Sequence, residues 1–535
     1  MNPLQFLRIL SLLVSAVLLT APTGGQVPRA KFAPAASYNP GPGPFSVAVA
    51  DLRRNGKLDL VVADFCETVN QSGNCTTGEG GISVLLGNDD GTFQPAVMYG
   101  TGAYSAWSIA VGDVNGDGIP DLVVSDWCRY EDCSPANGAV SVLLGNGDGT
   151  FQPPVLYGSG GYDAYSVALA DLRNNGQVDI VVTNTYYDKT FFHGGVSVLL
   201  GNGDGTFQAA VGYDSGGRIA TSVAVGDVSG DGIPDLVVAN YYRGDSDGEM
   251  AVLLGRGDGT FQPAVLYDSG GEFAYSVALG DLRGNGVLDA VVANRWSDNQ
   301  TGLRGEVSVL LGNGNGTFQP AAAYLEHGMD YASYPAIGPG INSLAIADMN
   351  GDGIPDLAVV QQCQNLRHYT DCVGEKELNV FLGNGDGTFQ APYLYSSGGF
   401  VGSALTVADV NRDGRPDLVV ANEDASEQDF QTGSVAVLLN ETSYTSKTAL
   451  AASPNPSHVN QSVTFTATTT PGVPSGEVVT FYNGKTQLGT GKTANGVATL
   501  TTSFSKAGKY TIKAAYPGDA FRKPSSGTVK QVVTP

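Results

Sequence analysis

The chain consists of short apolar stretches separated by turn-forming residues, and this pattern recurs along most of its length. The stretch DLRRNGKLDLVVAD begins at Asp51, and six related stretches follow at steps of 54 to 67 residues. They begin at Asp113, Asp171, Asp227, Asp281, Asp348 and Asp409. Each repeat contains four short segments in which Val alternates with Ala or Ser, or in which apolar residues run together. This pattern favours β-strands, and the fixed period predicts one structural unit per repeat.

Four antiparallel strands repeated around an axis form the blades of a β-propeller, so residues 32–440 are predicted to form a seven-bladed β-propeller. The fourth strand has the signature F-x-x-x-x-x-Y and follows a third strand six times. A seventh copy, residues 32–38, precedes the first repeat, whereas the last repeat ends near Asn440 without one. We therefore expect segment 32–38 to complete the seventh blade and to remove its free edge.

The last part of the chain differs from the repeats. After a polar linker at residues 441–446, residues 447–535 are rich in Thr and alternate apolar with polar positions. Several short strands in this length predict an immunoglobulin-like β-sandwich. The segment has neither Cys nor Trp, so the disulfide and Trp of antibody domains are absent. The predicted fold class is all-β.

Composition and charge agree with many strands and turns and exclude some functions. Glycine accounts for 73 of the 535 residues, about twice its usual share of ~7%. With 28 Lys and Arg against 52 Asp and Glu, the net charge is −24. The chain has no basic stripe, which excludes nucleic acid as a partner and argues against adhesion to anionic lipid. The acidity suits divalent cations, or solubility after export.

The N-terminus and the cysteines indicate export. Residues 1–25 resemble a secretory signal peptide, with one Arg, an apolar run too short to span a bilayer, and small residues. The alternative is a buried strand or an anchor. With no later apolar span either, we expect a protein that is secreted or associated with the cell surface, does not insert into a membrane, and is a monomer.

The six cysteines form three close pairs that read as disulfides, with free thiols as the alternative. The pairs are Cys66 with Cys75, Cys128 with Cys133, and Cys363 with Cys372.

Four repeats carry the loop D-x-[NS]-x-D-G-x-P-D between their first and second strands. Calcium takes six to eight oxygen ligands, many of them carboxylate, from a tightly folded loop. Positions one, three, five and nine supply side-chain oxygens, and position seven supplies a main-chain carbonyl. We predict about four calcium ions per chain, with a purely capped turn as the alternative. The candidate ligands are Asp113, Asn115, Asp117, Ile119 and Asp121; Asp227, Ser229, Asp231, Ile233 and Asp235; Asp348, Asn350, Asp352, Ile354 and Asp356; and Asp409, Asn411, Asp413, Arg415 and Asp417.

The other three loops have Arg at the third position: Arg53, Arg173 and Arg283. Their first and ninth aspartates are retained. A cationic side chain cannot bind calcium, so we expect each guanidinium to occupy the metal's place and to bridge both aspartates. The alternative is an Arg that points to solvent over an empty loop.

Seven blades with these loops resemble the FG-GAP repeats of integrin α-subunit propellers, and more closely the bacterial exported FG-GAP/VCBS-repeat proteins. The resemblance covers residues 32–440, although the literal FG and GAP tripeptides are not evident. Residues 474–502 are similar to bacterial Ig-like domains. Together these resemblances imply recognition or adhesion, with a carbohydrate or an extracellular protein as the partner, rather than one particular reaction.

The rim opposite the acidic loops is the candidate ligand surface. Its loops are long and rich in aromatic residues, which suit stacking on sugars or anchoring a protein partner. The candidates are Trp127, Tyr130, Tyr186, Tyr187, Tyr241, Tyr242, Trp296 and Tyr369. The alternative is that these aromatics pack on one another. No H-E-x-x-H or G-x-S-x-G motif occurs, so no catalytic residue is assigned. A polysaccharide hydrolase or lyase on the same rim, or a structural surface protein, are the alternatives to a binding module.

Overall fold

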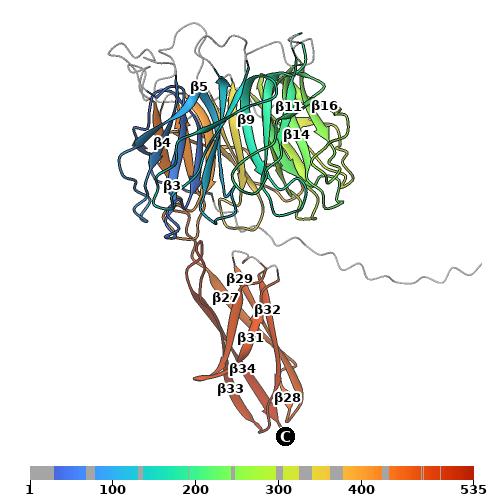
Figure 1. Ribbon diagram of the computed structural model, residues 1–535. Coiled ribbons are helices and arrows are strands. Elements are labelled where there is room, and N and C mark those ends of the chain that lie inside the picture. Colours follow the sequence, from blue (N-terminus) through green and yellow to red (C-terminus); the bar gives the residue numbers. More distant parts are fainter. Residues whose placement is uncertain are drawn as a thin grey trace, which may run out of the picture.

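A computed structural model describes residues 29–67, 79–129, 137–188, 190, 192–242, 247–296, 305–323, 340–361, 378–399, 401–423, 433–470, 473, 475–494 and 496–535. Every regular element in this part of the chain is a β-strand. The strands form a seven-bladed propeller and a separate β-sandwich, as predicted (Figure 1). Among the described residues, no helix is long and apolar enough to cross a membrane.

Each blade has four antiparallel strands, ordered from the central axis outward. Blades one to three contain β2 (Pro44–Ala50), β3 (Asp59–Asp64), β4 (Glu79–Leu85), β5 (Val97–Gly112), β6 (Asp121–Cys128), β7 (Ala139–Leu143), β8 (Val155–Gly158), β9 (Tyr162–Ala170), β10 (Asp179–Tyr186), β11 (Gly195–Leu199) and β12 (Val211–Asp214). Blades four and five contain β13 (Arg218–Gly226), β14 (Asp235–Tyr242), β15 (Asp247–Leu253), β16 (Val265–Gly280), β17 (Asp289–Trp296), β18 (Glu306–Leu310) and β19 (Ala322–Ala323). Blades six and seven contain β20 (Ile341–Ala347), β21 (Asp356–Gln361), β22 (Leu378–Phe381), β23 (Tyr393–Tyr395), β24 (Gly402–Ala408), β25 (Asp417–Asn422), β26 (Ser434–Leu438) and β1 (Ala36–Tyr38).

Two long strands each belong to two blades. The first half of β5 is the outer strand of blade one and its second half is the inner strand of blade two; β16 joins blades four and five in the same way. Two blades joined by a continuous strand form one seven-stranded sheet, which is why two such sheets occur.

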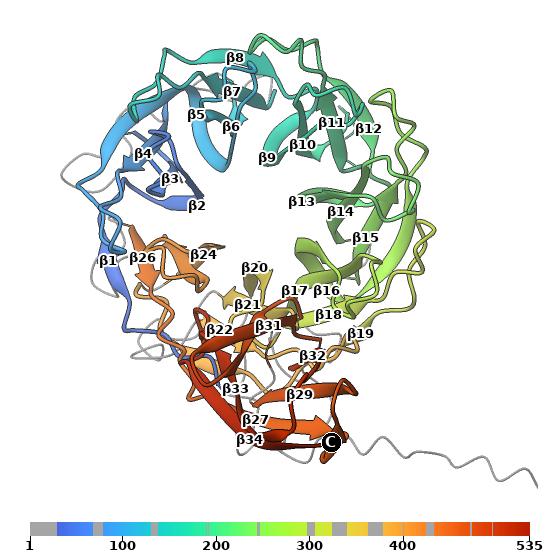
Figure 2. The ribbon, with the colours of Figure 1, turned by 90° about the horizontal axis from the view of Figure 1, so that it is seen from below.

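The N-terminal strand closes the ring. Strand β1 pairs antiparallel with β26, with Ala36 opposite Val437, and Phe32 forms a further bridge with Asn440. In Figure 2, β1 lies beside β26 at the outer edge of blade seven. Both ends of the propeller segment therefore meet in one blade, which leaves no unpaired edge between first and last repeat.

The recurring spacing of Phe and Tyr in the fourth strands has a clear packing role. The Tyr of one blade meets the Phe of the next edge to face, with ring centroids 5.2–5.8 Å apart. Such pairs contribute roughly 0.5–1.5 kcal/mol each beyond their buried area. The described pairs are Tyr38–Phe93, Tyr99–Phe151, Tyr157–Phe207, Tyr213–Phe261, Tyr267–Phe318 and Tyr395–Phe32.

Residues 447–535 form the sandwich. One sheet contains β27 (Lys447–Ser453), β29 (Ser462–Thr470) and β32 (Val497–Ser503). The other contains β28 (Ser457–His458), β34 (Ser525–Thr534), β33 (Gly508–Tyr516), β30 (Val478–Asn483) and β31 (Thr486–Lys492). The core of the sandwich is built around the fully buried Phe465, Phe481 and Tyr516.

The sandwich lies against the propeller rim that carries the loops between first and second strands (Figures 1 and 2). Phe521, which follows β33, packs on Gly351 of blade six so closely that a Cβ there would lie 2.3 Å from its ring. Tyr444 of the interdomain segment donates its hydroxyl to the Asn350 carbonyl at 2.7 Å, and its backbone pairs with Phe521 and Lys523. The segment 441–446 is thus held between the two domains.

Candidate functional site

The first and ninth aspartates hold the acidic loops by backbone hydrogen bonds. In blade two, Asp113 accepts the N–H groups of Gly116, Asp117 and Gly118 at 2.7–3.2 Å. Asp121 is fully buried and accepts the N–H groups of Val114 and Gly145 at 2.9 and 2.8 Å. In six blades the ninth Asp accepts the N–H of a glycine in the next hairpin turn, and in blade seven it accepts the N–H of Asn440, which follows the third strand. The accepting aspartates are Asp59, Asp121, Asp179, Asp235, Asp289, Asp356 and Asp417. These two aspartates therefore have a structural role in both loop types.

The two loop types differ at positions three and five. The four candidate calcium loops have Asn or Ser at three and Asp at five, which makes three carboxylates per loop. Burial raises the pKa of Asp356 to about 8, and the charges of Asp352 and Asp348 add to the rise. Burial likewise raises the pKa of Asp417 to about 7, with Asp413 and Asp409 adding to it. The negative charge in these loops is thus poorly compensated.

The oxygen donors of these loops are of the kind that calcium takes: carboxylates, an amide or hydroxyl oxygen, and a main-chain carbonyl. Within the described residues, no three His, Cys, Asp or Glu side chains converge closely enough to be recognised as a metal site. The residue chemistry fits calcium, and the four ions stay a prediction.

The arginines of blades one, three and five lie in their loops, but they do not bridge both aspartates, so that expectation was wrong. Arg173 donates from Nε and Nη2 to Asp179 at 3.2 and 2.6 Å, and from Nη2 to the Gly201 carbonyl at 2.7 Å. Arg53 and Arg283 form the same bonds. The first-position Asp171 instead accepts backbone N–H groups of its own loop. The guanidinium bonds the ninth Asp and a main-chain carbonyl, whereas the carboxylate of the first Asp is occupied by backbone N–H groups. No bond is therefore left for the guanidinium to form with the first Asp.

These bonds and the nearby guanidinium stabilise the ionised form of Asp171. Burial alone would raise its pKa, but the N–H donors of Asn175, Gly176 and Arg173 and the charge of Arg173 outweigh burial and lower it. The Arg side chains are only 16–20% exposed, which contradicts the alternative of an Arg that points to solvent.

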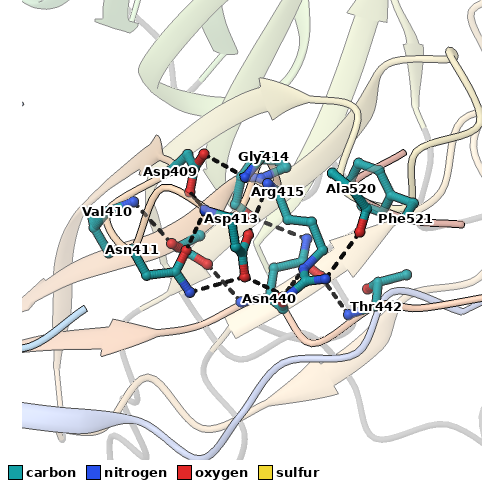
Figure 3. Close-up of polar contacts among 12 residues, drawn as sticks. Asp409, Val410, Asn411, Asp413, Gly414, Arg415, Asn440, Thr442, Ala520 and Phe521 are labelled. Atoms are coloured by element: carbon teal, nitrogen blue, oxygen red, sulfur yellow. Dashed lines mark hydrogen bonds and ion pairs between the residues drawn. The ribbon is translucent and has the colours of Figure 1, made fainter. Parts of the chain in front are cut away.

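Blade seven is intermediate between the two types (Figure 3). The Arg415 side chain forms an ion pair with Asp413 at position five. It also donates to the Asn440 carbonyl at 2.6 Å and to the Ala520 carbonyl of the sandwich at 3.0 Å. The predicted contribution of Arg415 was its main-chain carbonyl alone, so the sequence reasoning missed its side chain. The bond to Ala520 joins residues that are 105 positions apart in the chain, so no local motif reveals it.

On the opposite rim, the candidate aromatics divide into two groups. Trp127 and Tyr241 pack inward: Trp127 lies 5.1 Å from Trp107, and Tyr241 lies 4.6 Å from Phe273. Tyr187 is exposed, whereas Tyr186 and Tyr242 are half-buried. The alternative of mutual packing therefore holds for part of the rim. Tyr130 and Tyr369 lie outside the described residues, and of Trp296 only the backbone is described.

Two of the six cysteines fall in the described part. Cys66 and Cys128 are both buried, and neither is a free thiol. Their expected partners Cys75 and Cys133, and the pair Cys363 with Cys372, lie outside the described residues. The pairing stays a prediction, as does the signal peptide at residues 1–25.

The structure adds a pocket that the sequence reasoning did not find. It has a volume of about 160 Å³ and lies where the seven innermost strands begin, on the same side as the aromatic loops. In every blade the innermost strand has a β-bulge against the second strand at the same point. A bulge turns one extra side chain away from its normal direction. The seven bulged residues, all of which line the pocket, are Phe45, Trp107, Tyr165, Thr221, Tyr275, Asn342 and Ser403.

A signal for this pocket was present in the repeats. The residue before a recurring Ser differs from blade to blade, as in AWSIA, AYSVA, ATSVA and INSLA, while its neighbours vary little. One variable residue among nearly constant neighbours is expected where the repeated strands form a fixed frame and that residue lines a binding pocket.

The chain belongs to the FG-GAP-like repeat family. The family profile matches residues 74–124, 133–182, 190–238, 227–292, 296–359 and 371–420, which together make up more than half of the chain. Residues 450–534 match the bacterial Ig-like domain (group 3). Both resemblances inferred from the sequence are confirmed.

Curated relatives and solved structures agree with this assignment. Over 31% of its own length, the chain is 29% identical to integrin alpha-V of Gallus gallus. Over 41% of its own length, it is 28% identical to integrin alpha pat-2 of Caenorhabditis elegans. It spans only 17–20% of the length of these integrins. The structure is similar to an exotype rhamnogalacturonan lyase, YesX (TM-score 0.35, 12% identity, 72% of both chains), and to the Dos1 propeller (TM-score 0.43, 10% identity, 76% of this chain and 95% of that one). Both scores are below 0.5, so the seven-bladed architecture rests on the strand pairing itself.

Proposed function

We propose that this protein is an exported, calcium-stabilised β-propeller that acts as a non-catalytic recognition or adhesion module for carbohydrate or an extracellular protein. The supporting observation is that the two rims of the propeller carry different kinds of residues. One rim is occupied by acidic loops and by the sandwich. The other rim carries the aromatic side chains, and loops on a rigid scaffold are where binding residues concentrate.

Calcium has a structural role in this proposal. Four ions, one for each loop with three aspartates, would neutralise carboxylates that burial brings together. Metal analysis of dialysed protein is expected to return about four calcium ions per chain. Seven ions, or none, would contradict the assignment of the loops.

The sequence and the family support export. FG-GAP repeats and a bacterial Ig-like domain favour an extracellular or surface location, and residues 1–25 are the segment that would direct it. Disulfides in the aromatic loops would stiffen that rim, and the sandwich would act as a spacer or a second attachment surface. We expect a monomer.

The test is an array of glycans and polysaccharides probed with residues 26–535, in calcium and again after chelation. Selective binding to one class of glycan supports a recognition module. Release of product from a bound polysaccharide would instead establish the alternative of a hydrolase or lyase. The absence of binding by folded protein would move the assignment to a protein partner or to a structural role.

A further inference from the structure

We infer that the axial pocket binds one neutral sugar residue and that its seven bulged side chains determine which sugar is accepted. This inference rests on the proposed recognition function and assigns it to the axis rather than to the outer loops. Three features of the pocket carry it: the way its residues are aimed, its supply of hydrogen-bond donors, and the orientation of its aromatic rings.

The same structural device aims one side chain from every blade at the axis. Each bulge places its extra residue toward the pocket, and bulges are frequent next to binding and active sites for this reason. The seven residues differ, although the surrounding strands are near copies. Four are aromatic (Phe45, Trp107, Tyr165 and Tyr275) and three are polar (Thr221, Asn342 and Ser403). The pocket therefore presents both aromatic and polar side chains, which suits a sugar ring with its apolar C–H groups and its hydroxyls. The three polar residues already donate to main-chain carbonyls, so free hydrogen-bond donors must come from other residues.

A second ring, of serines, supplies hydroxyl protons. The residue after the bulge is Ser in six blades, and all six line the pocket. Ser46 and Ser108 accept the N–H groups of Ile109 and Val167 from the next blade at 3.3 Å, and Ser222 and Ser343 do the same. These hydroxyls are held in place as acceptors, and within the described residues they have no acceptor for their own protons. They can donate to an oxygen-rich ligand.

The stacking of the aromatic rings leaves no open face on Trp107 for a cationic ligand. Phe45 stacks on Trp107 with 4.3 Å between centroids, and Trp107 stacks on Tyr165 with 4.8 Å. Their faces are covered by one another, so a cation cannot lie on the negative face of Trp107. The edge of an aromatic ring is electropositive and attracts oxygen atoms. Ring edges and hydroxyl donors together favour hydroxyl and ether oxygens.

Charged groups near the pocket balance. Glu423 lines it, while Arg295 lies behind Tyr275, with its guanidinium carbon 3.9 Å from the ring centroid. Arg295 also donates to Asn342 at 3.3 Å. One carboxylate and one guanidinium leave no net charge for an anion or a cation to neutralise, which points to a neutral ligand.

The natural reporter is tryptophan fluorescence, because Trp107 and Trp127 belong to this cluster and the chain has only three Trp. Residues 26–535 would be titrated in calcium with methyl glycosides of glucose, galactose, mannose and fucose. Glucosamine and glucuronate serve as charged probes. A saturable fluorescence change with one or two neutral glycosides, and not with the charged sugars, supports the inference.

The matched variants separate the pocket from the outer rim. Thr221→Tyr fills the pocket with a side chain that blades three and five already carry at the same bulge, and Ser403→Tyr does so from another blade. Each is expected to weaken binding at least tenfold. Because each variant also loses the bonds of the native hydroxyl to main-chain carbonyls, its cooperative thermal unfolding is measured beside binding to show that it folds. Tyr187→Ala, on the exposed rim, is expected to leave binding unchanged.

Two outcomes would overturn the inference in distinguishable ways. If glycan binding survives both pocket-filling variants but is lost in Tyr187→Ala, the ligand lies on the outer rim, and the proposed recognition function stands. If neither the glycan array nor the titration detects binding, the axial site and the carbohydrate function fall together.

Discussion

The loops of blades one, three and five and those of blades two, four, six and seven share one backbone design but compensate their charge differently. In both types the first Asp caps the loop and the ninth Asp binds the next hairpin turn. In the first type an arginine of the loop binds the buried ninth Asp. In the second type a third Asp takes the fifth position, and we predict that a calcium ion compensates its charge. If that prediction holds, a repeat keeps the same loop backbone whether its compensating charge is an arginine or a bound calcium ion.

The largest expected effect is that of removing calcium. Each occupied site stabilises the fold by ~2.7 kcal/mol when the free ion is at 100 times its Kd. With four sites, chelation is expected to lower the melting temperature far more than any single substitution. Differential scanning calorimetry in calcium and in EGTA measures this. Equal melting temperatures in both would remove the distinction between the two loop types.

The arginine loops can be broken one at a time. Arg53→Ala leaves the fully buried Asp59 without its guanidinium, and removing one partner of a buried pair typically costs about 3–5 kcal/mol. The matched control is Arg54→Ala, since Arg54 is the next residue and is exposed. A surface substitution of that kind usually changes stability by less than ~0.5 kcal/mol. Equal effects of the two variants, measured by denaturant unfolding, would show that Arg53 is not an internal cation.

The two types should also interconvert. The double variant Arg53→Asn, Asn55→Asp gives blade one the residues of a calcium loop at positions three and five. It is expected to bind one more calcium than the parent and to be less stable than the parent in EGTA. Calorimetric titration gives the stoichiometry. An unchanged ion count would mean that residues outside positions three and five decide which loops bind metal.

The blades also differ at the far end of their second strands, where some have a buried Asp and others an Asn. This difference predicts that the stability of the fold depends on pH. Blades one and two have the buried Asp64 and Asp126, whose pKa values burial raises to about 7. At the same position, blades three, four, five and seven have Asn. Because the folded state holds these protons more tightly than the unfolded state, stability should fall as the pH rises from about 4 to about 7 and then level off.

Replacing both acids tests that contrast. Asp64→Asn and Asp126→Asn are each expected to stabilise the protein by on the order of 2 kcal/mol above pH 7 and to flatten the pH profile. Unfolding at pH 5 and pH 8 measures both effects. Asn184→Ala, which removes the equivalent amide of blade three, serves as a control because it should destabilise equally at both pH values. A steep pH profile that persists in the double Asn variant would assign the dependence to other groups.

The smallest effect is expected in blade seven. Arg415→Ile introduces the residue that the other three predicted calcium loops have at the seventh position. It removes a positive charge from Asp413, and a unit charge at about 4 Å in water is worth ~1 kcal/mol. Calcium affinity at one of the four sites should rise about fivefold. An affinity that falls instead would show that the contact of Arg415 with the sandwich holds the loop in its binding shape.

The sequence reveals most where cause and effect lie within one repeat. The sequence alone reveals the seven aspartate loops and the Tyr and Phe of the fourth strands. It also reveals that the last repeat lacks an outer strand of its own. Arg53 was correctly placed inside its loop, but its bond to Gly87 was not foreseen, because that carbonyl lies 34 residues away. Arg415 was misjudged for the same reason.

By itself, then, the sequence determines seven four-stranded units, their two loop types and a different domain at the end, because strand period and loop spacing act over about ten residues. Only the tertiary structure decides that seven bulged residues, one from each repeat, surround a single pocket. It likewise decides that Phe521 rests on Gly351. The physical reason is that ring closure and domain docking bring together side chains whose separation in the chain carries no local signal.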